Sequence, residues 1–123
     1  MDNNINIISD AKFREIAILG CELYNLNKID EAHEKWEEIW KDGDLIQKKA
    51  IKGLIQISGG TIQFERAKMD SVSYLLNLAV KNLSAQKILN DVINVNQLVT
   101  DLKNIITKLE NNNLKELKIN IKF

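Results

Sequence analysis

The chain has 123 residues, of which 45% are hydrophobic, and its 17 basic side chains are balanced by 17 acidic ones. This length suits one domain, and this apolar content excludes a globally disordered protein. A formal net charge of zero argues against a nucleic-acid partner, which would require a basic patch. The absence of proline favours helices over an all-β fold built on many turns.

The cysteine content and the first residues bear on where the protein resides. A single cysteine, Cys21, excludes an internal disulfide and fits a reducing compartment. The opening stretch MDNNINIISDAKF has neither the cationic start nor the long apolar run of a signal peptide. No segment approaches the roughly 18 consecutive apolar residues of a membrane helix. We therefore expect a soluble cytoplasmic protein with no membrane partner.

Hydrophobic residues recur at helical spacing along most of the chain. In chain order, the predicted helices run over about residues 10–26, 28–41, 45 to 66 or 68, 71–83 and 95–110. Each is preceded by a residue that can accept hydrogen bonds from the first helical turn. These expected N-caps are Asp10, Asn27, Asp44, Asp70 and Asn94. The stretch 84–93 is ambiguous between a loop and a short helix.

The last ten residues have a different pattern. Apolar side chains alternate there, at Leu117, Ile119, Ile121 and Phe123, which predicts an extended segment over 114–123 lying on the helices. The sequence thus predicts an all-α fold, a single domain over 1–123 with a compact bundle of about five helices. Its core spans about 10–110.

The first two predicted helices resemble one tetratricopeptide (TPR) hairpin. The matching positions are Ile16, Leu19, Gly20, Leu23, Ala32 and Trp36. The match does not continue one repeat of about 34 residues later, so no solenoid is expected. We interpret the pattern as a TPR-like antiparallel hairpin in which Gly20 lets the second helix approach the first.

The segment EAHEKWEEIWKD, residues 31–42, holds the only histidine, both tryptophans and four glutamates. On a helix of about 100° per residue, Trp36 and Trp40 lie along the apolar stripe. His33 lies at its margin, one turn from Glu37 and able to pair with it. The simplest interpretation is a pair of core tryptophans beside a structural histidine–carboxylate pair.

The third predicted helix has a wide apolar arc that includes Glu65. A carboxylate in such an arc needs a partner, and His33 is the candidate that we expect. Gly53 and Gly60 lie one heptad apart and each costs about 1 kcal/mol relative to alanine. They indicate either a close helix crossing or an open floor for a ligand.

Enzymatic alternatives centre on the same histidine. HEKWE resembles the start of the zinc motif H-E-x-x-H, but Glu37 stands where the second histidine is needed. A di-iron site would use E-x-x-H, which is absent, so we expect neither a metal site nor a cofactor. General acid–base chemistry by His33 with Glu34 or Glu37 remains possible, although the sequence offers no nucleophile and no catalytic residue is assigned.

The block HEKWEEIW at 33–40, followed by GLIQI at 53–57, resembles the family catalogued as domain of unknown function 309. That family has a "feaHEvwEelW" block, a "qGLIQlaaal" block and a later Leu-Leu segment, which Leu75 and Leu76 match. The resemblance covers about residues 13–110 and implies a small all-helical bundle without an established activity. The chain departs from the family at Ser58-Gly59-Gly60, where alanines are usual, and at Ser71-Val72, where Gly-Ala is usual.

The favoured hypothesis is a non-catalytic binding or protein-interaction module with a pocket beside the second and third helices. The expected pocket residues are His33, Glu34, Trp36, Glu37, Trp40, Gln56 and Glu65. The expected partner is a protein or a small molecule. A small hydrolase or metal-assisted enzyme is the alternative, and a homodimer is a further possibility.

Overall fold

The structure is a computed structural model that describes residues 8–123. Residues 1–7, which hold most of the stretch where no signal peptide is expected, lie outside it. The helices are α1 (Asp10–Asn25), α2 (Ile29–Asp42), α3 (Leu45–Glu65), α4 (Met69–Ala85), the short 3-10 helix η1 (Ile88–Asp91) and α5 (Val95–Glu110). The described residues contain no strand, so the predicted all-α bundle of about five helices is confirmed.

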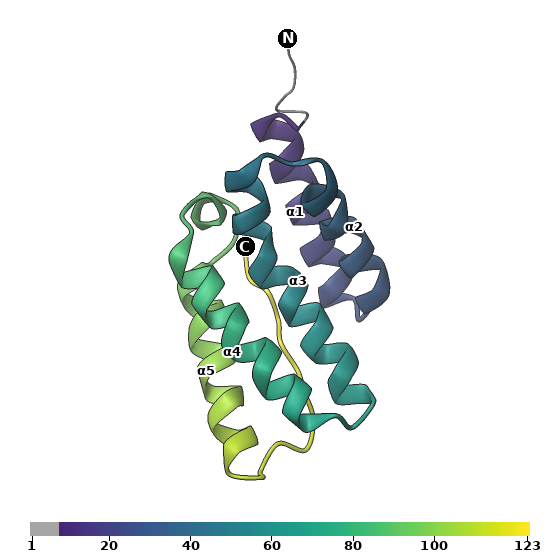
Figure 1. Ribbon diagram of the computed structural model, residues 1–123, viewed down its shortest axis with the longest axis vertical. Helices are drawn as coiled ribbons and strands as arrows, with labels where there is room; N and C mark the ends of the chain where they lie inside the picture. Colours follow the sequence, from purple (N-terminus) through teal and green to yellow (C-terminus); the bar gives the residue numbers. More distant parts are fainter. Residues whose placement is uncertain (1–7) are drawn as a thin grey trace.

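The long helix α3 lies in the middle of the molecule (Figure 1). The hairpin of α1 and α2 packs on one side of it, and α4 and α5 lie on the other. Successive α-helices alternate in direction, and the chain after α5 runs back beside α3 without regular secondary structure. The extended segment predicted for 114–123 is therefore confirmed.

The start of α3 is the helix boundary that the sequence predicts best. The Asp44 carboxylate accepts a hydrogen bond from the Gln47 backbone N–H at 2.8 Å. The Gln47 side chain accepts one from the Asp44 N–H at 2.9 Å, which completes the capping box. Asn94 likewise caps α5 as predicted, through the Gln97 N–H at 3.0 Å.

Other boundaries differ from the prediction by one or two residues. The N-cap of α1 is Ser9, whose hydroxyl accepts from the Lys12 N–H at 3.1 Å, and not Asp10. α4 begins at Met69, so Asp70 lies in its first turn instead of capping it. The reason is the sharp turn after α3, where Ala67 has a left-handed backbone (φ 58°) that its sequence does not signal.

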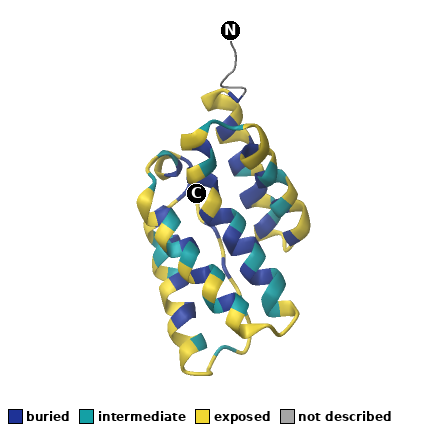
Figure 2. Ribbon diagram, viewed as in Figure 1, coloured by how far each residue is buried: buried dark blue, intermediate teal, exposed yellow. Residues whose placement is uncertain are grey.

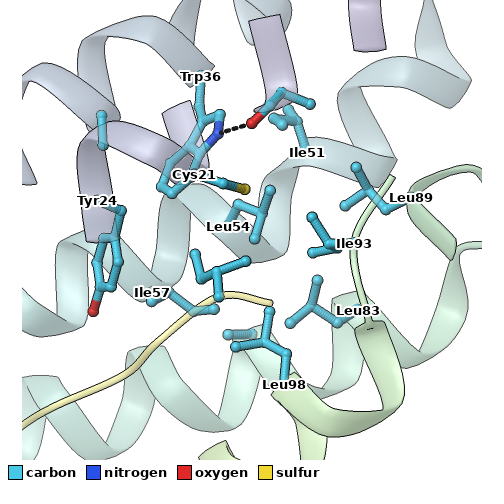
Figure 3. Packing of buried hydrophobic residues seen from close by; sticks show 14 of the residues in the cluster. Cys21, Tyr24, Trp36, Ile51, Leu54, Ile57, Leu83, Leu89, Ile93 and Leu98 are labelled. Atoms are coloured by element: carbon cyan, nitrogen blue, oxygen red, sulfur yellow. Dashed lines mark hydrogen bonds between the residues drawn. The ribbon is translucent and has the colours of Figure 1, made fainter. Parts of the chain in front are cut away.

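Buried side chains from all five α-helices meet around α3 (Figures 2 and 3). The close helix approach predicted at Gly20 is confirmed, because a Cβ there would lie 2.1 Å from Trp36 Nε1. A Cβ on Gly53 would meet Leu83 at 2.7 Å, and one on Gly60 would meet Leu76 at 2.9 Å. The two glycines of α3 therefore allow a close crossing with α4, and no open floor remains there.

The segment 114–123 follows the predicted alternation over most of its length. Ile119 and Ile121 are buried and Leu117 is half-buried. Phe123 is 61% exposed, so the prediction is wrong at this position. Within residues 8–123, no helix combines the length and the apolar content needed to cross a membrane.

Candidate functional site

His33 connects α2 to α3 through a chain of polar contacts. Its Nδ1 lies 2.7 Å from Ser58 Oγ, and its Nε2 lies 3.5 Å from the Glu37 carboxylate. The Ser58 hydroxyl donates its hydrogen to the Ile55 carbonyl oxygen at 2.6 Å. Since a serine has one hydroxyl hydrogen, Ser58 must accept the hydrogen bond from His33. The ring is therefore protonated at Nδ1, and its Nε2 faces Glu37.

The predicted pairing of His33 with Glu65 is wrong. Glu65 is the last residue of α3 and is exposed to solvent, beyond the part of the helix that α2 covers. It lies near Tyr24 instead, where its charge is one of the causes that raise the pKa of the tyrosine. Burial is the larger cause and brings the Tyr24 pKa to about 12. Ser58, which the sequence analysis named only as a departure from the family pattern, is the partner of His33 on α3.

The two tryptophans of α2 have different environments. Trp36 is fully buried, stacks on Tyr24 with 6.2 Å between ring centroids, and donates from Nε1 to the Ala17 carbonyl at 3.2 Å (Figure 3). It belongs to the hydrophobic core. Trp40 is 42% exposed, so its expected place in the apolar stripe is wrong. The buried face of α2 follows the helical spacing Ile29, Ala32, Trp36, Ile39, which turns Trp40 outward.

Trp40 and Glu37 stand between two adjoining hollows of the surface. The smaller one, of about 180 Å³, is also lined by Lys52, Ile55 and Gln56 of α3. The larger, of about 580 Å³, is shallow and lies along α2. Its other lining residues are His33, Glu34, Glu38 and Lys41. We call these lining residues together the Trp40 surface.

The Trp40 surface contains five of the seven predicted pocket residues: His33, Glu34, Glu37, Trp40 and Gln56. Trp36 and Glu65 do not line it. Lys52 was missed as a pocket residue, although its ammonium lies 5.8 Å from the centre of the Trp40 ring. Gln56 lines the smaller hollow, and its side-chain oxygen accepts a hydrogen bond from the Asn82 side chain of α4 at 2.8 Å. α2, α3 and α4 thus hold the surface in place together.

Two candidate nucleophiles, Cys21 and Ser58, are shielded. Cys21 is fully buried, and burial together with the charge of Glu22 raises its pKa from 9.0 to about 12. A protonated buried thiol is a poor nucleophile. Ser58 is fully buried as well, and its hydroxyl hydrogen is bound to a carbonyl. Over residues 8–123, no three histidine, cysteine or carboxylate side chains form a group that could hold a metal ion.

Comparison with known proteins finds one similarity to these residues. A search of curated proteins found no match to the chain. A family model does match, over residues 18–74, and its description is "Domain of unknown function (DUF309)". The matched segment includes α2, α3 and every residue of the Trp40 surface. This match confirms, over residues 18–74, the resemblance drawn from the HEKWEEIW and GLIQI blocks.

Proposed function

We propose that the protein is a non-catalytic binding module that docks a partner protein on the Trp40 surface. The observation that carries this proposal is the position of Trp40, a large exposed ring between two hollows. Tryptophan side chains at such positions contribute a disproportionate share of binding energy in protein interfaces. Their rings are rigid and bury a large area at little cost in conformational entropy.

The charges around the ring favour a basic group on the partner. Glu34, Glu37 and Glu38 line the larger hollow beside Lys41, and Glu38 is already paired with Lys35 at 2.9 Å. An arginine or lysine side chain laid in that hollow would meet the carboxylates of Glu34 and Glu37. The Lys52 ammonium already lies 5.8 Å from the centre of the Trp40 ring, so the carboxylates and not the ring are the contacts offered to a basic group. Opposite charge across an interface favours the correct partner and speeds association.

The alternative is a hydrolase in which His33, oriented by Glu37, activates Ser58. The three side chains are in contact, which supports the idea in outline. Two facts argue against it. Ser58 is buried out of reach of a substrate, and its hydroxyl hydrogen is directed to Ile55 and not to the histidine. A nucleophile activated by a base must donate its hydrogen to that base.

The test is a selection from a displayed peptide library with the full chain as bait. The affinities of the enriched peptides are then measured by fluorescence anisotropy for the wild type and for Trp40→Ala. Tyr74→Ala is the matched control, since Tyr74 is an exposed aromatic residue (66%) outside the Trp40 surface. We expect basic peptides whose affinity falls at least about tenfold in Trp40→Ala and stays unchanged in the control. A selection without enrichment, or peptides that bind both variants equally, would refute the proposal.

A further inference from the structure

The helices α2 and α3 run antiparallel past Trp40, which fixes the order of the side chains along their shared face (Figure 1). His33 contacts Ser58, and further along α2 the Trp40 ring has the ammonium of Lys52, earlier on α3, at 5.8 Å from its centre. Trp40 and Lys52 therefore lie at the same height along the helix pair. Residues of α2 before Trp40 lie on one side of this height, and residues of α3 before Lys52 lie on the other.

The charges on the two sides of Trp40 have opposite signs. On the side of the preceding α2 residues, Glu34 and Glu37 line the Trp40 surface. On the other side, toward the corner between α2 and α3, Lys41 lines it, and Lys48 and Lys49 lie on α3. Within residues 8–123, neither Glu34 nor any of these three lysines forms an ion pair. The face thus has an acidic end and a basic end.

Two carboxylates near the corner leave the sign of the basic end unchanged. Asp44 accepts the Gln47 N–H in the capping box, so its charge is directed to the start of α3. Asp42 follows two residues after Trp40, which on a helix of about 100° per residue turns its side chain about 160° away from the ring. Lysines therefore outnumber carboxylates on the part of this end that shares a face with Trp40.

A two-fold axis through Trp40, perpendicular to the face, would make this pattern complementary to itself. At a rise of about 1.5 Å per residue, Glu34 lies about 9 Å from Trp40 along α2. Lys48 lies about 6 Å from Lys52 along α3, in the opposite direction. A rotation by 180° places the basic end of one copy over the acidic end of the other, and the same contact then forms twice. The two Trp40 rings meet near the axis.

We propose that the partner docked on the Trp40 surface is a second copy of this chain, and that the two copies form a symmetric dimer across this face. The inference rests on the binding role proposed above and names the partner for that role. The basic groups that suit Glu34 and Glu37 are then Lys48 and Lys49 of the second copy. Opposite charges at both ends fix the register of the two copies and select the antiparallel arrangement.

Exposed apolar side chains supply the rest of the contact area. Trp40 is 42% exposed, and Leu45 and Ile46 at the corner are 68% and 66% exposed. Large apolar side chains that gather on a surface mark sites of protein interaction. Exposed charge pairs add little each and are screened by salt, so we expect a dimer that is in equilibrium with the single chain and weakens as the salt concentration rises.

The first test is sedimentation equilibrium of the full chain over a series of concentrations at low salt. We expect the mass to rise from one copy towards two. Trp40→Ala should raise the dissociation constant at least about tenfold, whereas the exposed Tyr74→Ala should leave it unchanged. A wild type with the mass of one copy at every concentration would overturn the inference. If library peptides still bound that chain through Trp40, the binding role would stand without the dimer.

Charge reversal tests the arrangement of the two copies. Glu34→Lys sets a lysine against the lysines of the second copy, and Lys48→Glu with Lys49→Glu sets carboxylates against Glu34. Each variant alone should dimerise at least about tenfold more weakly than the wild type. An equimolar mixture of the two variants pairs opposite charges at both ends and should recover the wild-type affinity, which damage to folding would not allow.

Two results would overturn the assignment to this face. One is a mixture of the two charge variants that stays as weak as each variant alone. The other is a wild-type dimer that Trp40→Ala and both charge variants leave intact, which would place the interface elsewhere. Circular dichroism checks that the variants are folded, and Lys49→Glu alone replaces the double change if that variant loses helix, since Lys49 is exposed and Lys48 is half-buried.

Discussion

Gly20→Ala tests the packing of α1 on α2, which positions the helix that carries the Trp40 surface. A Cβ at residue 20 would lie 2.1 Å from Trp36 Nε1 and 2.5 Å from its Cδ1. The indole would have to retreat by about 1.3 Å to reach an ordinary contact of 3.4 Å. Trp36 is fully buried, so we expect the cost of an overpacked core.

Three contributions set the size of the effect. Overpacking of a core costs about 1–3 kcal/mol. Moving the ring also breaks the Trp36–Ala17 hydrogen bond and leaves a buried N–H without a partner, at about 1–3 kcal/mol. Alanine in place of glycine within a helix stabilises the folded chain by about 1 kcal/mol, which offsets part of this loss. The expected net loss in the free energy of unfolding is about 1–5 kcal/mol.

The assay is urea unfolding followed by circular dichroism. Gly59→Ala is the matched control, since its Cβ would lie 3.4 Å from the end of the flexible Leu75 side chain. That variant should gain about 0.5–1 kcal/mol from helix propensity alone. Gly20→Ala combined with Trp36→Phe should recover part of the loss, because the smaller ring leaves room for the methyl group. A Gly20→Ala chain as stable as the wild type would refute the packing described for α1 and α2.

Three other predictions concern the cap of α3, the buried titrating groups and the exposed tryptophan. Asp44→Ala should lower the free energy of unfolding by about 1 kcal/mol through loss of the capping box, and an unchanged urea midpoint would contradict this. The pKa values of Cys21 and Tyr24 are raised in the folded chain from 9.0 and 10.0 to about 12, so the unfolded chain loses these protons first. Stability should therefore fall as pH rises from about 9 towards about 12, and the fall should be smaller in a Cys21→Ala, Tyr24→Phe double variant; equal slopes would contradict the assignment. Acrylamide should quench Trp40 but not the other tryptophan, so Trp40→Phe should remove the quenchable emission; quenching that persists in this variant would mean that the core indole is accessible.

Helical periodicity was sufficient to predict the number and order of the helices. The stripes of α3 and α5 and the capping residues Asp44 and Asn94 mark their elements locally, without reference to the rest of the fold. The predicted helix boundaries are wrong where a turn depends on a backbone conformation that the residue types do not indicate. The left-handed Ala67 is the example, since alanine has no preference for that region.

The candidate site was predicted less completely, for reasons that depend on tertiary packing. The helical wheel of α2 placed Trp40 along the apolar stripe, whereas the packing of α1 and α3 covers Ile39 and leaves Trp40 exposed. The partner of His33 depends on how α2 and α3 are aligned, and Ser58 lies 25 residues away in sequence.

The protonated nitrogen of His33 separates a binding role from a catalytic one. Because His33 is the only histidine, its two ring nitrogens can be assigned without ambiguity in a nitrogen-15 NMR spectrum of the full chain. In the neutral ring we predict a hydrogen on Nδ1, donated to Ser58, and a bare Nε2. Ser58→Ala should weaken the preference of the ring hydrogen for Nδ1, since it removes the hydroxyl oxygen that accepts this hydrogen. A neutral ring with its hydrogen on Nε2 would mean that Nδ1 accepts the Ser58 hydrogen, which would contradict a non-catalytic module and support a serine hydrolase.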